Sequence, residues 1–435
     1  MRDLACQIFQ HALAEANVDR AFDRYVELNR GVLRVGDDLF DLAAYTRHFV
    51  VSVGKAANTM VEALAAKAGE GFEGIVASPD AGGSVATAQQ VRGYRYFRGG
   101  HPTPNADSML AADAVLRALR SLDPHSLVLF MISGGGSSIL EKPLDSEISL
   151  PDLIATYKAL VLCGAPIAEI NAIRKHLSAV KGGRLALAAN GAQQVSLLVS
   201  DVPDATPDAL ASGPTMPDST SIFDCKTLVA KYDLLPQFPA SVRELFEQDA
   251  LEETPKSDDP VFVRSRWCTI LSNKSAVDAA AAEATRLGFT VAIDNSCDDW
   301  DYDRAAEYLL GRVRDLRRGH PRVCLISGGE VTVKVTGKPG IGGRNQQFAL
   351  ACAGRVAGEN ITVLSGGTDG IDGNSLAAGA VVDGTTVARA AAVGLDTARS
   401  LSNFDAYPLF QTLGDVVVTG PTGNNVRDLR ILLAD

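Results

Sequence analysis

Three apolar runs that each end in Ser-Gly-Gly constrain the fold of this chain most. Leu127–Ile132 leads into Ser133-Gly134-Gly135, Val323–Ile326 into Ser327-Gly328-Gly329, and Ile361–Leu364 into Ser365-Gly366-Gly367. A short β-branched run followed by small residues is typical of a buried parallel strand that ends at the carboxyl edge of a sheet. Glycines there permit positive φ and let a ligand approach backbone N–H groups, which can form an anion-binding nest. Three copies predict strand ends that converge on one anion, for which the phosphates of a nucleotide are the leading candidate.

Strands and helices alternate through the N-terminal part of the chain. Strands are predicted at His48–Val53, Gly74–Ser78, Leu127–Ile132 and Val195–Val199, and helices at Ala56–Lys67, Ala106–Ser121, Leu153–Cys163 and Ala168–Ala189. Alternation of this kind implies parallel pairing through right-handed crossovers, and therefore an α/β fold with a doubly wound sheet. Ligands of such sheets bind outside the carboxyl ends of the strands.

A domain boundary is predicted within residues 236–260, which contain four prolines and a dense acidic stretch. We expect one domain over residues 1–240 and a second, smaller α/β domain over 241–435. In the second domain the strictly alternating Val331–Val335 predicts a half-exposed strand, and a helix is expected at Asn345–Ala357.

Composition excludes several classes of protein. The chain has 435 residues, 46% hydrophobic and 21% charged, with a formal net charge of −11. An acidic balance argues against a nucleic-acid-binding protein, which needs a basic face. No apolar run approaches the ~20 residues of a membrane span. The seven scattered cysteines form no Cys-x-x-Cys pair and fit reduced thiols, so a cytoplasmic enzyme is expected.

Lys55 is the first candidate for chemistry, because it stands between a predicted strand and a predicted helix. There it would lie beside the free N–H groups and the positive end of the helix dipole, and could neutralise a phosphate. The alternative is a solvent-facing lysine in the first turn of a helix. The loop is not a Walker A motif, since Phe49 and Ala56 occupy positions where that motif requires glycine and Ser/Thr.

Two aspartates follow predicted strands and could hold Mg²⁺ or act as a base. Asp201 follows Val195–Val199, and Asp369 follows the third Ser-Gly-Gly. Magnesium prefers hard oxygen ligands and usually takes one or two from protein. Each aspartate could equally cap the following turn.

A cationic stretch and a glycine-rich loop are further candidates for anion binding. Arg174, Lys181 and Arg184 fall on one face of the helix predicted at Ala168–Ala189, although such a charge run can also be a solvated face. The loop Gly337–Gly343 precedes Arg344, whose guanidinium fork suits a carboxylate or phosphate, and could close over a ligand. A passive hairpin tip is the alternative for this loop.

Taken together, these motifs resemble the glycerate 2-kinase family, also called the MOFRL family. The matching strings run in order along nearly the whole chain: VGKAA at 53–57, HPTPNAD at 101–107, SGGGSS at 133–138, NAIRKHLSAVKGGRLA at 171–186, SDVPD at 200–204, ASGPT at 211–215, GGRNQ at 342–346, TDGIDG at 368–373, AAGAVVD at 377–383 and TGPTGNNV at 419–426.

The resemblance implies an ATP- and Mg²⁺-dependent kinase that phosphorylates D-glycerate to 2-phosphoglycerate. It implies a Rossmann-like N-terminal domain with a mostly parallel sheet, a C-terminal α/β domain with a mixed sheet, and an active site in the cleft between them. Lys55, Asp201 and Arg344 match the family's catalytic positions, and Asp201 and Asp369 are the candidate metal ligands. The predicted substrate- and nucleotide-binding residues are Ser133, Gly134, Gly135, Gly136, Ser137, Arg174, Lys181, Ser327, Gly328, Gly329, Glu330, Gly343, Asn345, Gln346, Thr368 and Asp369.

Two alternatives come from other classes. An NAD(P)H-dependent hydroxypyruvate reductase needs a Gly-x-Gly-x-x-Gly that follows a strand and opens a helix; Gly340-Ile341-Gly342 comes nearest but reaches Asn345 in place of the last glycine. A non-catalytic sugar-phosphate- or nucleotide-binding regulator would not need Lys55, Asp201 and Arg344 together. The sequence leaves the oligomeric state open, with a homodimer as one option.

Overall fold

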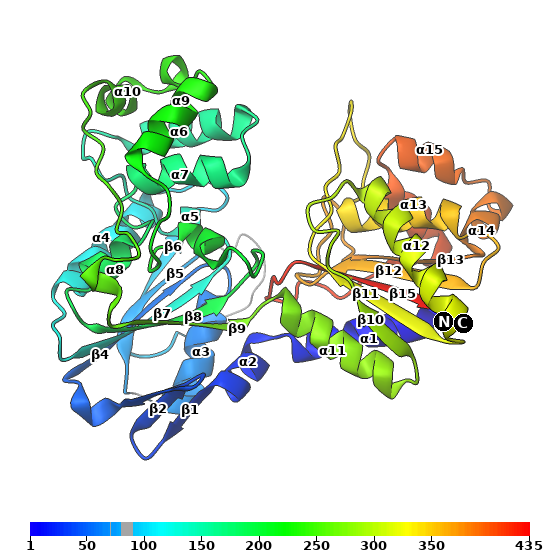
Figure 1. Cartoon of the computed structure of the whole chain (residues 1–435), viewed down its shortest axis with the longest axis horizontal. Helices are drawn as coiled ribbons and strands as arrows, with labels where there is room; N and C mark the ends of the chain where they lie inside the picture. Colours follow the sequence, from blue (N-terminus) through cyan, green and yellow to red (C-terminus); the bar gives the residue numbers. More distant parts are fainter. Residues whose placement is uncertain (70, 80–89) are drawn as a thin grey trace. The chain divides into compact units, whose positions relative to one another are not determined.

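The computed structural model describes residues 1–69, 71–79 and 90–435, which separate into two compact units (Figure 1). The first unit is Ala21–Ile270, and the second combines Met1–Arg20 with Leu271–Asp435. The division therefore differs from the boundary predicted at residue 240. Residues 241–270 belong with the first unit because Phe246 packs into one of its cores and a strand at Ser265–Leu271 joins its sheet.

The first unit is built on a six-stranded sheet in the order β6-β5-β4-β7-β8-β9. Its strands are β4 (Arg47–Val53), β5 (Glu73–Pro79), β6 (Tyr94–Gly99), β7 (Ser126–Ser133), β8 (Gln193–Val199) and β9 (Ser265–Leu271). Strands β4 to β8 pair in parallel. The chain starts at β4, winds outward through β5 and β6, and returns to β7 to wind the other way. The predicted doubly wound fold is confirmed, and the winding reverses between β4 and β7.

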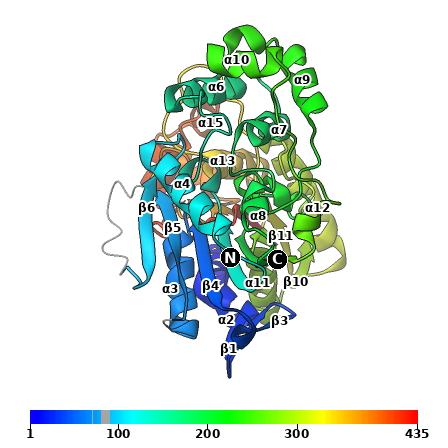
Figure 2. The ribbon, with the colours of Figure 1, turned by 90° about the vertical axis from the view of Figure 1, so that its left-hand side faces the viewer.

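Helices cover both faces of this sheet. On one face α4 (Ala106–Arg120), α5 (Gly136–Ile139) and α8 (Arg184–Ala188) share a core with alternate residues of β4 and β7. On the other face α3 (Ala57–Ala68) follows β4 and contacts β4, β5 and β7. A separate core joins four helices that lie together at one end of the unit in Figures 1 and 2: α6 (Leu150–Leu162), α7 (Ile167–Leu177), α9 (Ile222–Lys231) and α10 (Ala240–Glu247).

A small antiparallel sheet of this unit was not predicted. It consists of β1 (Val26–Asn29), β2 (Val32–Val35) and β3 (Asp38–Asp41), and follows α2 (Val18–Tyr25). These strands are only four residues long and carry several polar side chains. Their pattern is therefore too short for reliable detection.

The helix predicted over 168–189 is wrong. Helix α7 ends at Leu177, Ser178 forms an antiparallel bridge with Pro143, and α8 begins only at Arg184. Gly182 (φ +56°) and Gly183 (φ +82°) adopt left-handed conformations in between. Such conformations break an α-helix, so the cations of this stretch do not share one helical face.

The second unit contains a mixed six-stranded sheet, as predicted. The order is β10-β11-β15-β12-β13-β14, with β10 and β11 parallel and the remaining neighbours antiparallel. The strands are β10 (Thr290–Ile293), β11 (Val323–Gly328), β12 (Ile361–Gly367), β13 (Gly379–Asp383), β14 (Val416–Val417) and β15 (Asp428–Ala434). The unpredicted β15 lies between β11 and β12, so the second and third Ser-Gly-Gly tripeptides flank its beginning.

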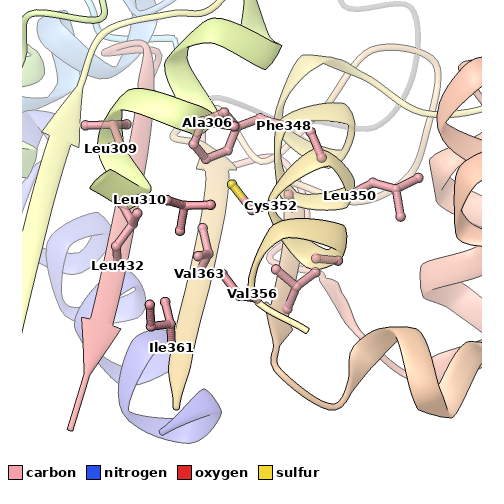
Figure 3. Close-up of a cluster of buried hydrophobic side chains, with 14 of the residues drawn as sticks. Ala306, Leu309, Leu310, Phe348, Leu350, Cys352, Val356, Ile361, Val363 and Leu432 are labelled. Atoms are coloured by element: carbon pink, nitrogen blue, oxygen red, sulfur yellow. The ribbon is translucent and has the colours of Figure 1, made fainter. Parts of the chain in front are cut away.

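Alternate residues of these strands build two cores. In β11, Val323 and Leu325 face α12 (Tyr302–Gly319) and α13 (Arg344–Arg355), in the core shown in Figure 3. Cys324 and Ile326 face the opposite side, where α1 (Arg2–Glu15) packs with α11 (Asn273–Arg286). Both faces are apolar because helices cover both. Short helices α14 (Thr386–Ala392), α15 (Thr397–Ser402) and α16 (Ala406–Leu413) complete the unit.

The predicted strand Val331–Val335 is also wrong. Apart from one bridge between Thr332 and Asp301, this segment is irregular, although its alternation is strict. Alternation alone does not make a strand, because strand formation depends on pairing and packing with neighbours. Over the ranges that the structure covers, none of the helices is long and apolar enough to cross a bilayer.

Candidate active site

The loops that follow β4 and β7 are tied together by their backbones. The N–H of Lys55 donates to the carbonyl of Gly134 at 2.9 Å, and the N–H of Ala56 donates to the Ser133 hydroxyl at 3.0 Å. The Ser133 hydroxyl in turn donates to the carbonyl of Val53 at 3.3 Å, and Ser133 is buried. Ser133 therefore joins the two strand ends, while the exposed Lys55 side chain stays available.

Asp201 lies directly against this loop. A Cβ atom added to Gly134 would be only 1.9 Å from Asp201 Oδ2, so the carboxylate occupies space that any other residue at position 134 would fill. Gly54 is restricted to glycine in a similar way. Its φ is +117°, and a Cβ there would lie 2.3 Å from the Ser133 hydroxyl oxygen. The glycines thus let the carboxylate that follows β8 approach the backbone that follows β7.

His101 is a site residue that sequence reasoning missed. It follows β6, and its Cδ2 would lie 2.9 Å from a Cβ added to Gly135. Partial burial, with the nearby positive charge of Lys55, lowers the pKa of the His101 imidazole, so the ring is neutral at pH 7. The sequence signal was its place just beyond a strand, but the strand Tyr94–Gly99 itself was not predicted.

The 3₁₀-helix η2 (Pro207–Ser212) closes the other side of the loop. The hydroxyls of Ser137 and Ser212 lie 3.1 Å apart, and a Cβ on Gly136 would be 2.8 Å from the Cβ of Ala211. Ala211 and Ser212 both have φ of 50–61°, which is strained for residues other than glycine. Strain of this kind persists only where the surroundings enforce it, and it clusters at functional sites.

The predicted anion-binding residues Arg174 and Lys181 have interior partners instead. The buried ammonium of Lys181 forms an ion pair with the buried Glu141, which also accepts hydrogen bonds from Tyr157 and Ser178. The Arg174 guanidinium lies 4.6 Å from the Tyr157 ring centroid. Burial lowers the pKa of Lys181 and raises that of Tyr157. Lys181 therefore has no part in the site that we propose below.

A second group of predicted residues gathers around Arg344 in the second unit. Nε and Nη2 of Arg344 contact the two carboxylate oxygens of Asp428 at 2.6 and 3.0 Å, and Nη2 also pairs with Glu330 at 2.7 Å. Asp428 is buried and Arg344 is partly exposed. Burial together with the charge of Asp428 raises the pKa of the Glu330 carboxyl.

The Arg-Asn-Gln start of α13 is organised by a buried carboxylate. Asp372 accepts the backbone N–H groups of Asn345 and Gln346 at 3.0 and 2.9 Å, and the Gln346 side-chain amide at 3.0 Å. Burial raises the pKa of Asp372 to about 6. A Cβ on Gly343 would be 2.2 Å from Asp372 Oδ1, so this glycine is needed for close approach. The predicted binding residues Asn345 and Gln346 are buried and serve the loop's own architecture.

The other strand ends of the second unit are also occupied by protein groups. A Cβ on Gly328 would meet Asn273 Oδ1 at 1.8 Å, and one on Gly329 would meet Asp298 Oδ1 at 2.7 Å. The Thr368 hydroxyl donates to the Arg427 carbonyl at 2.7 Å. Asp369 Oδ1 accepts the N–H of Ile371 at 3.1 Å, which is the capping alternative for this residue. Ser327 is fully buried.

The predicted residues therefore form two groups, one within each unit. Lys55, Ser133–Ser137 and Asp201 come together in the first unit, and Glu330, Arg344 and the Ser327 and Thr368 strand ends in the second. In the described ranges no three His, Cys, Asp or Glu side chains cluster as a metal site. Asp201 as a single carboxylate still fits Mg²⁺, which takes one or two protein carboxylates plus phosphate oxygens.

Comparisons with known proteins identify the family. The domain described as "Domain of unknown function (DUF4147)" matches residues 4–247, and the MOFRL family matches residues 323–428. The glycerate 2-kinase of Pyrococcus horikoshii is 34% identical over 100% of this chain and 97% of its own. The chain belongs to the glycerate 2-kinase family.

Two further relatives of this family member bear on its fold and activity. The crystal structure of the glycerate kinase from Thermotoga maritima superposes with a TM-score of 0.86 at 33% identity, covering 100% of this chain and 99% of that one. A protein of Agrobacterium vitis that is 38% identical, over 89% of this chain and 87% of its own, carries the name hydroxypyruvate reductase. The relatives thus bear two different activity names.

Proposed function

We propose that this protein transfers the γ-phosphoryl group of ATP to O2 of D-glycerate, giving 2-phosphoglycerate and ADP. The observation that carries the proposal is the contact between the Asp201 carboxylate and the Gly134 backbone, at a strand end tied to Lys55. Phosphoryl transfer needs positioning and charge neutralisation more than covalent chemistry by the protein. The names of the Pyrococcus and Thermotoga relatives support glycerate as the acceptor.

Lys55 and Asp201 have complementary roles in this proposal. The exposed Lys55 ammonium neutralises charge on the phosphoryl oxygens, which lowers the barrier most when the donor is preorganised. Asp201 accepts the proton of the glycerate O2 hydroxyl as the O2–P bond forms and the bond from Pγ to the bridging oxygen breaks, releasing ADP. Asp201 is also the residue that would hold Mg²⁺, and the bound ion would add positive charge at the phosphate oxygens.

Arg344 is proposed as the third catalytic residue, at the position that matches the family. Asp428 and Glu330 occupy its Nε and Nη2 and so fix the plane of the guanidinium. Nη1 takes part in neither contact and supplies the donor for a substrate anion.

The proposal includes a cytoplasmic location for the protein. The seven cysteines are free thiols, which suits a reducing compartment.

The reductase name of the Agrobacterium relative is not extended to this chain. The spacing Gly-x-Gly-x-x-Gly occurs at Gly69, Gly71 and Gly74, but there it leads from helix α3 into strand β5. A dinucleotide site needs the reverse order, because the pyrophosphate binds at a helix N-terminus. The sequence thus lacks the element on which NAD(P)H binding would depend.

The test combines two assays on the full-length protein. ADP release is followed with ATP, Mg²⁺ and D-glycerate, and NADH oxidation is followed with hydroxypyruvate. Proton-coupled ³¹P NMR of the product reports the site of transfer, since a phosphate on O2 couples to one carbon-bound proton and a phosphate on O3 couples to two. A doublet with ADP release supports the proposal. NADH oxidation without ADP release contradicts it.

A further inference from the structure

A hollow in the first unit lies outside the group formed by Lys55, Gly134 and Asp201. Its volume is about 490 Å³, within the range of small-molecule sites. Leu198 of β8 and Trp267 of β9 contribute to its wall together with Met216 and Pro217, so the lining is largely apolar. None of the residues to which the proposed reaction assigns a role lines it.

Trp267 is held in place but not covered. Its indole N–H donates to the carbonyl of Thr215 at 3.0 Å, and its ring lies 6.1 Å from that of Phe262, centroid to centroid. The side chain nevertheless remains 39% exposed. An aromatic ring of fixed orientation beside an apolar hollow suits a planar, aromatic ligand, since such rings stack on nucleic-acid bases.

The 3₁₀-helix η2 links this hollow to Gly134–Gly136, the loop after β7 that we call the glycine loop. Its first residues, Pro207 and Asp208, line the hollow, while its last residues, Ala211 and Ser212, contact the loop at Gly136 and Ser137. The segment is kinked at Leu210 and Ala211, whose φ/ψ are not helical, and a Cβ added to Gly213 would lie 2.7 Å from the carbonyl oxygen of Asp208. The hollow and the glycine loop are therefore neighbours, and a ligand that occupies both must carry an apolar ring and an anionic group.

We propose that this hollow binds the base of the nucleotide, with Trp267 against the ring. The inference rests on the proposed function, because it takes ATP as the ligand whose phosphates reach the glycine loop. Asp208, Ser219 and Thr269 line the same hollow and supply hydrogen-bonding groups for the polar edge of a purine. The hollow thereby provides a binding site for the base, which is the part of the nucleotide that Lys55 and Asp201 do not reach.

Fluorescence provides a direct test, because the chain has only two tryptophans, Trp267 and Trp300. Trp300 lies in the second unit, so the variant Trp300→Phe leaves Trp267 as the single reporter. Adenosine and ADP should change its emission in a saturable way, whereas tripolyphosphate and D-glycerate alone should not. The inference is overturned if ADP binds by equilibrium dialysis without changing the emission, or if tripolyphosphate or D-glycerate alone changes it.

Kinetics separates this inference from the proposed function. Trp267→Ala should raise KM for ATP roughly tenfold, as expected when a base loses its stacking partner, and leave KM for glycerate within about twofold. Trp267→Phe should restore most of the affinity because it keeps a ring. If the wild type turns over glycerate but KM for ATP is unaffected in Trp267→Ala, the base site is wrong and the kinase stands. If adenosine alters Trp267 emission but no turnover occurs, the kinase is wrong and the base site stands.

Discussion

Lys55 keeps its side chain exposed at a strand end, whereas the interior lysines of the same unit have carboxylate partners. Lys175 reaches Asp208 and Asp218 at 3.0 and 3.2 Å, and Lys181 is buried against Glu141. A charge taken out of water must be compensated by such a partner, and is then unavailable to a ligand. Lys55 is a better candidate than Lys175 or Lys181 for binding a phosphate, because its side chain is exposed beside the glycine loop.

Replacing Lys55 should therefore affect turnover and not folding. We expect Lys55→Met to lower kcat by about 10²-fold or more, the loss seen when one preorganised donor is removed. Its melting temperature should match that of the wild type, because an exposed side chain contributes little burial. Lys226→Met is the matched control, since Lys226, on α9 of the same unit, is also exposed and pairs with Asp249. Normal kcat in Lys55→Met would remove Lys55 from the mechanism.

Asp201 should be needed for the chemical step more than for glycerate binding. Asp201→Asn keeps the shape that fits against Gly134 but removes the charge, so kcat should fall by about 10²-fold or more while KM for glycerate changes little. Steady-state kinetics over a series of Mg²⁺ concentrations measures both effects. Asp204→Asn, an exposed position in the same loop, should behave as the wild type. Wild-type turnover in Asp201→Asn at every Mg²⁺ concentration would leave Asp201 with only a capping role.

Cys225 and His176, both buried, lie in line with the exposed Glu253, and their spacing resembles a catalytic arrangement. Cys225 Sγ lies 3.2 Å from Nδ1 of His176, whose Nε2 lies 2.8 Å from Glu253. Nδ1 is also 2.8 Å from the carbonyl of Ala172, which can only accept a hydrogen bond. Burial raises the pKa of the Cys225 thiol to about 12. The arrangement is structural, because the buried Cys225 side chain remains a thiol at neutral pH and is not a nucleophilic thiolate.

At the scale of elements, the break between α7 and α8 explains why the cations of this stretch do not line one helical face. The extended Ser178 and the left-handed Gly182 and Gly183 turn the chain so that Lys181 points to Glu141 instead of following Arg174 around a helix. The predicted anion-binding face therefore does not form. Lys181 contributes to the interior of the fold, and the half-buried Arg174 packs on the ring of Tyr157.

Replacing Lys181 should destabilise the fold, because its partner Glu141 would lose the ion pair. Lys181→Met should lower the free energy of unfolding by about 3–5 kcal/mol, because Glu141 would remain buried with an uncompensated charge. The double variant Lys181→Met, Glu141→Gln should recover most of this loss. Urea unfolding followed by the emission of Trp267 in a Trp300→Phe background measures it. A single variant as stable as the wild type would contradict the structural role.

The elements that could be predicted are those with strong local signals. Apolar strands such as Leu127–Ile132 and the helix that follows Lys55 were found because their patterns are long and uniform. Strand β15 was missed because Asp428 and Arg430 interrupt its apolar pattern, and only the fold supplies their partners, Arg344 and the carbonyl of Gly328. His101 was missed because its relation to Gly135 depends on tertiary contact between two loops.

Asp372, which binds the start of α13, should make the free energy of unfolding depend measurably on pH. Its pKa is about 6 when folded, raised by burial, and about 4 when unfolded, so the folded chain binds more protons between pH 4 and 6. The free energy of unfolding should therefore fall as pH rises through this window, by about 3 kcal/mol relative to Asp372→Asn. Urea unfolding at pH 4, 5, 6 and 7, read from Trp300 in a Trp267→Phe background, gives the difference. Parallel curves for the two proteins would contradict the raised pKa.

At the scale of the whole molecule, the chain begins in the unit where it also ends. Helix α1 packs with α11 against β12 and β15, and its Phe9 ring lies 2.7 Å from where a Cβ on Gly366 would be. Arg2 adds a salt bridge to Asp415 and a hydrogen bond to the carbonyl of Val381 at 3.1 Å. The residues of the first unit are thus inserted between two parts of the second, which the sequence alone did not indicate.

This topology predicts that a change near the N-terminus destabilises the unit formed by the C-terminal half. Phe9 is fully buried, and Phe9→Ala should cost about 3–5 kcal/mol through lost transfer energy and the cavity left beside Gly366. The unfolding transition of Trp300, in a Trp267→Phe background, should move to lower urea, while that of Trp267, in a Trp300→Phe background, should stay in place. Phe223→Ala serves as the control because Phe223 is 77% exposed. If the Trp267 transition shifts as far as that of Trp300, the stabilising contacts of α1 do not belong to the second unit alone.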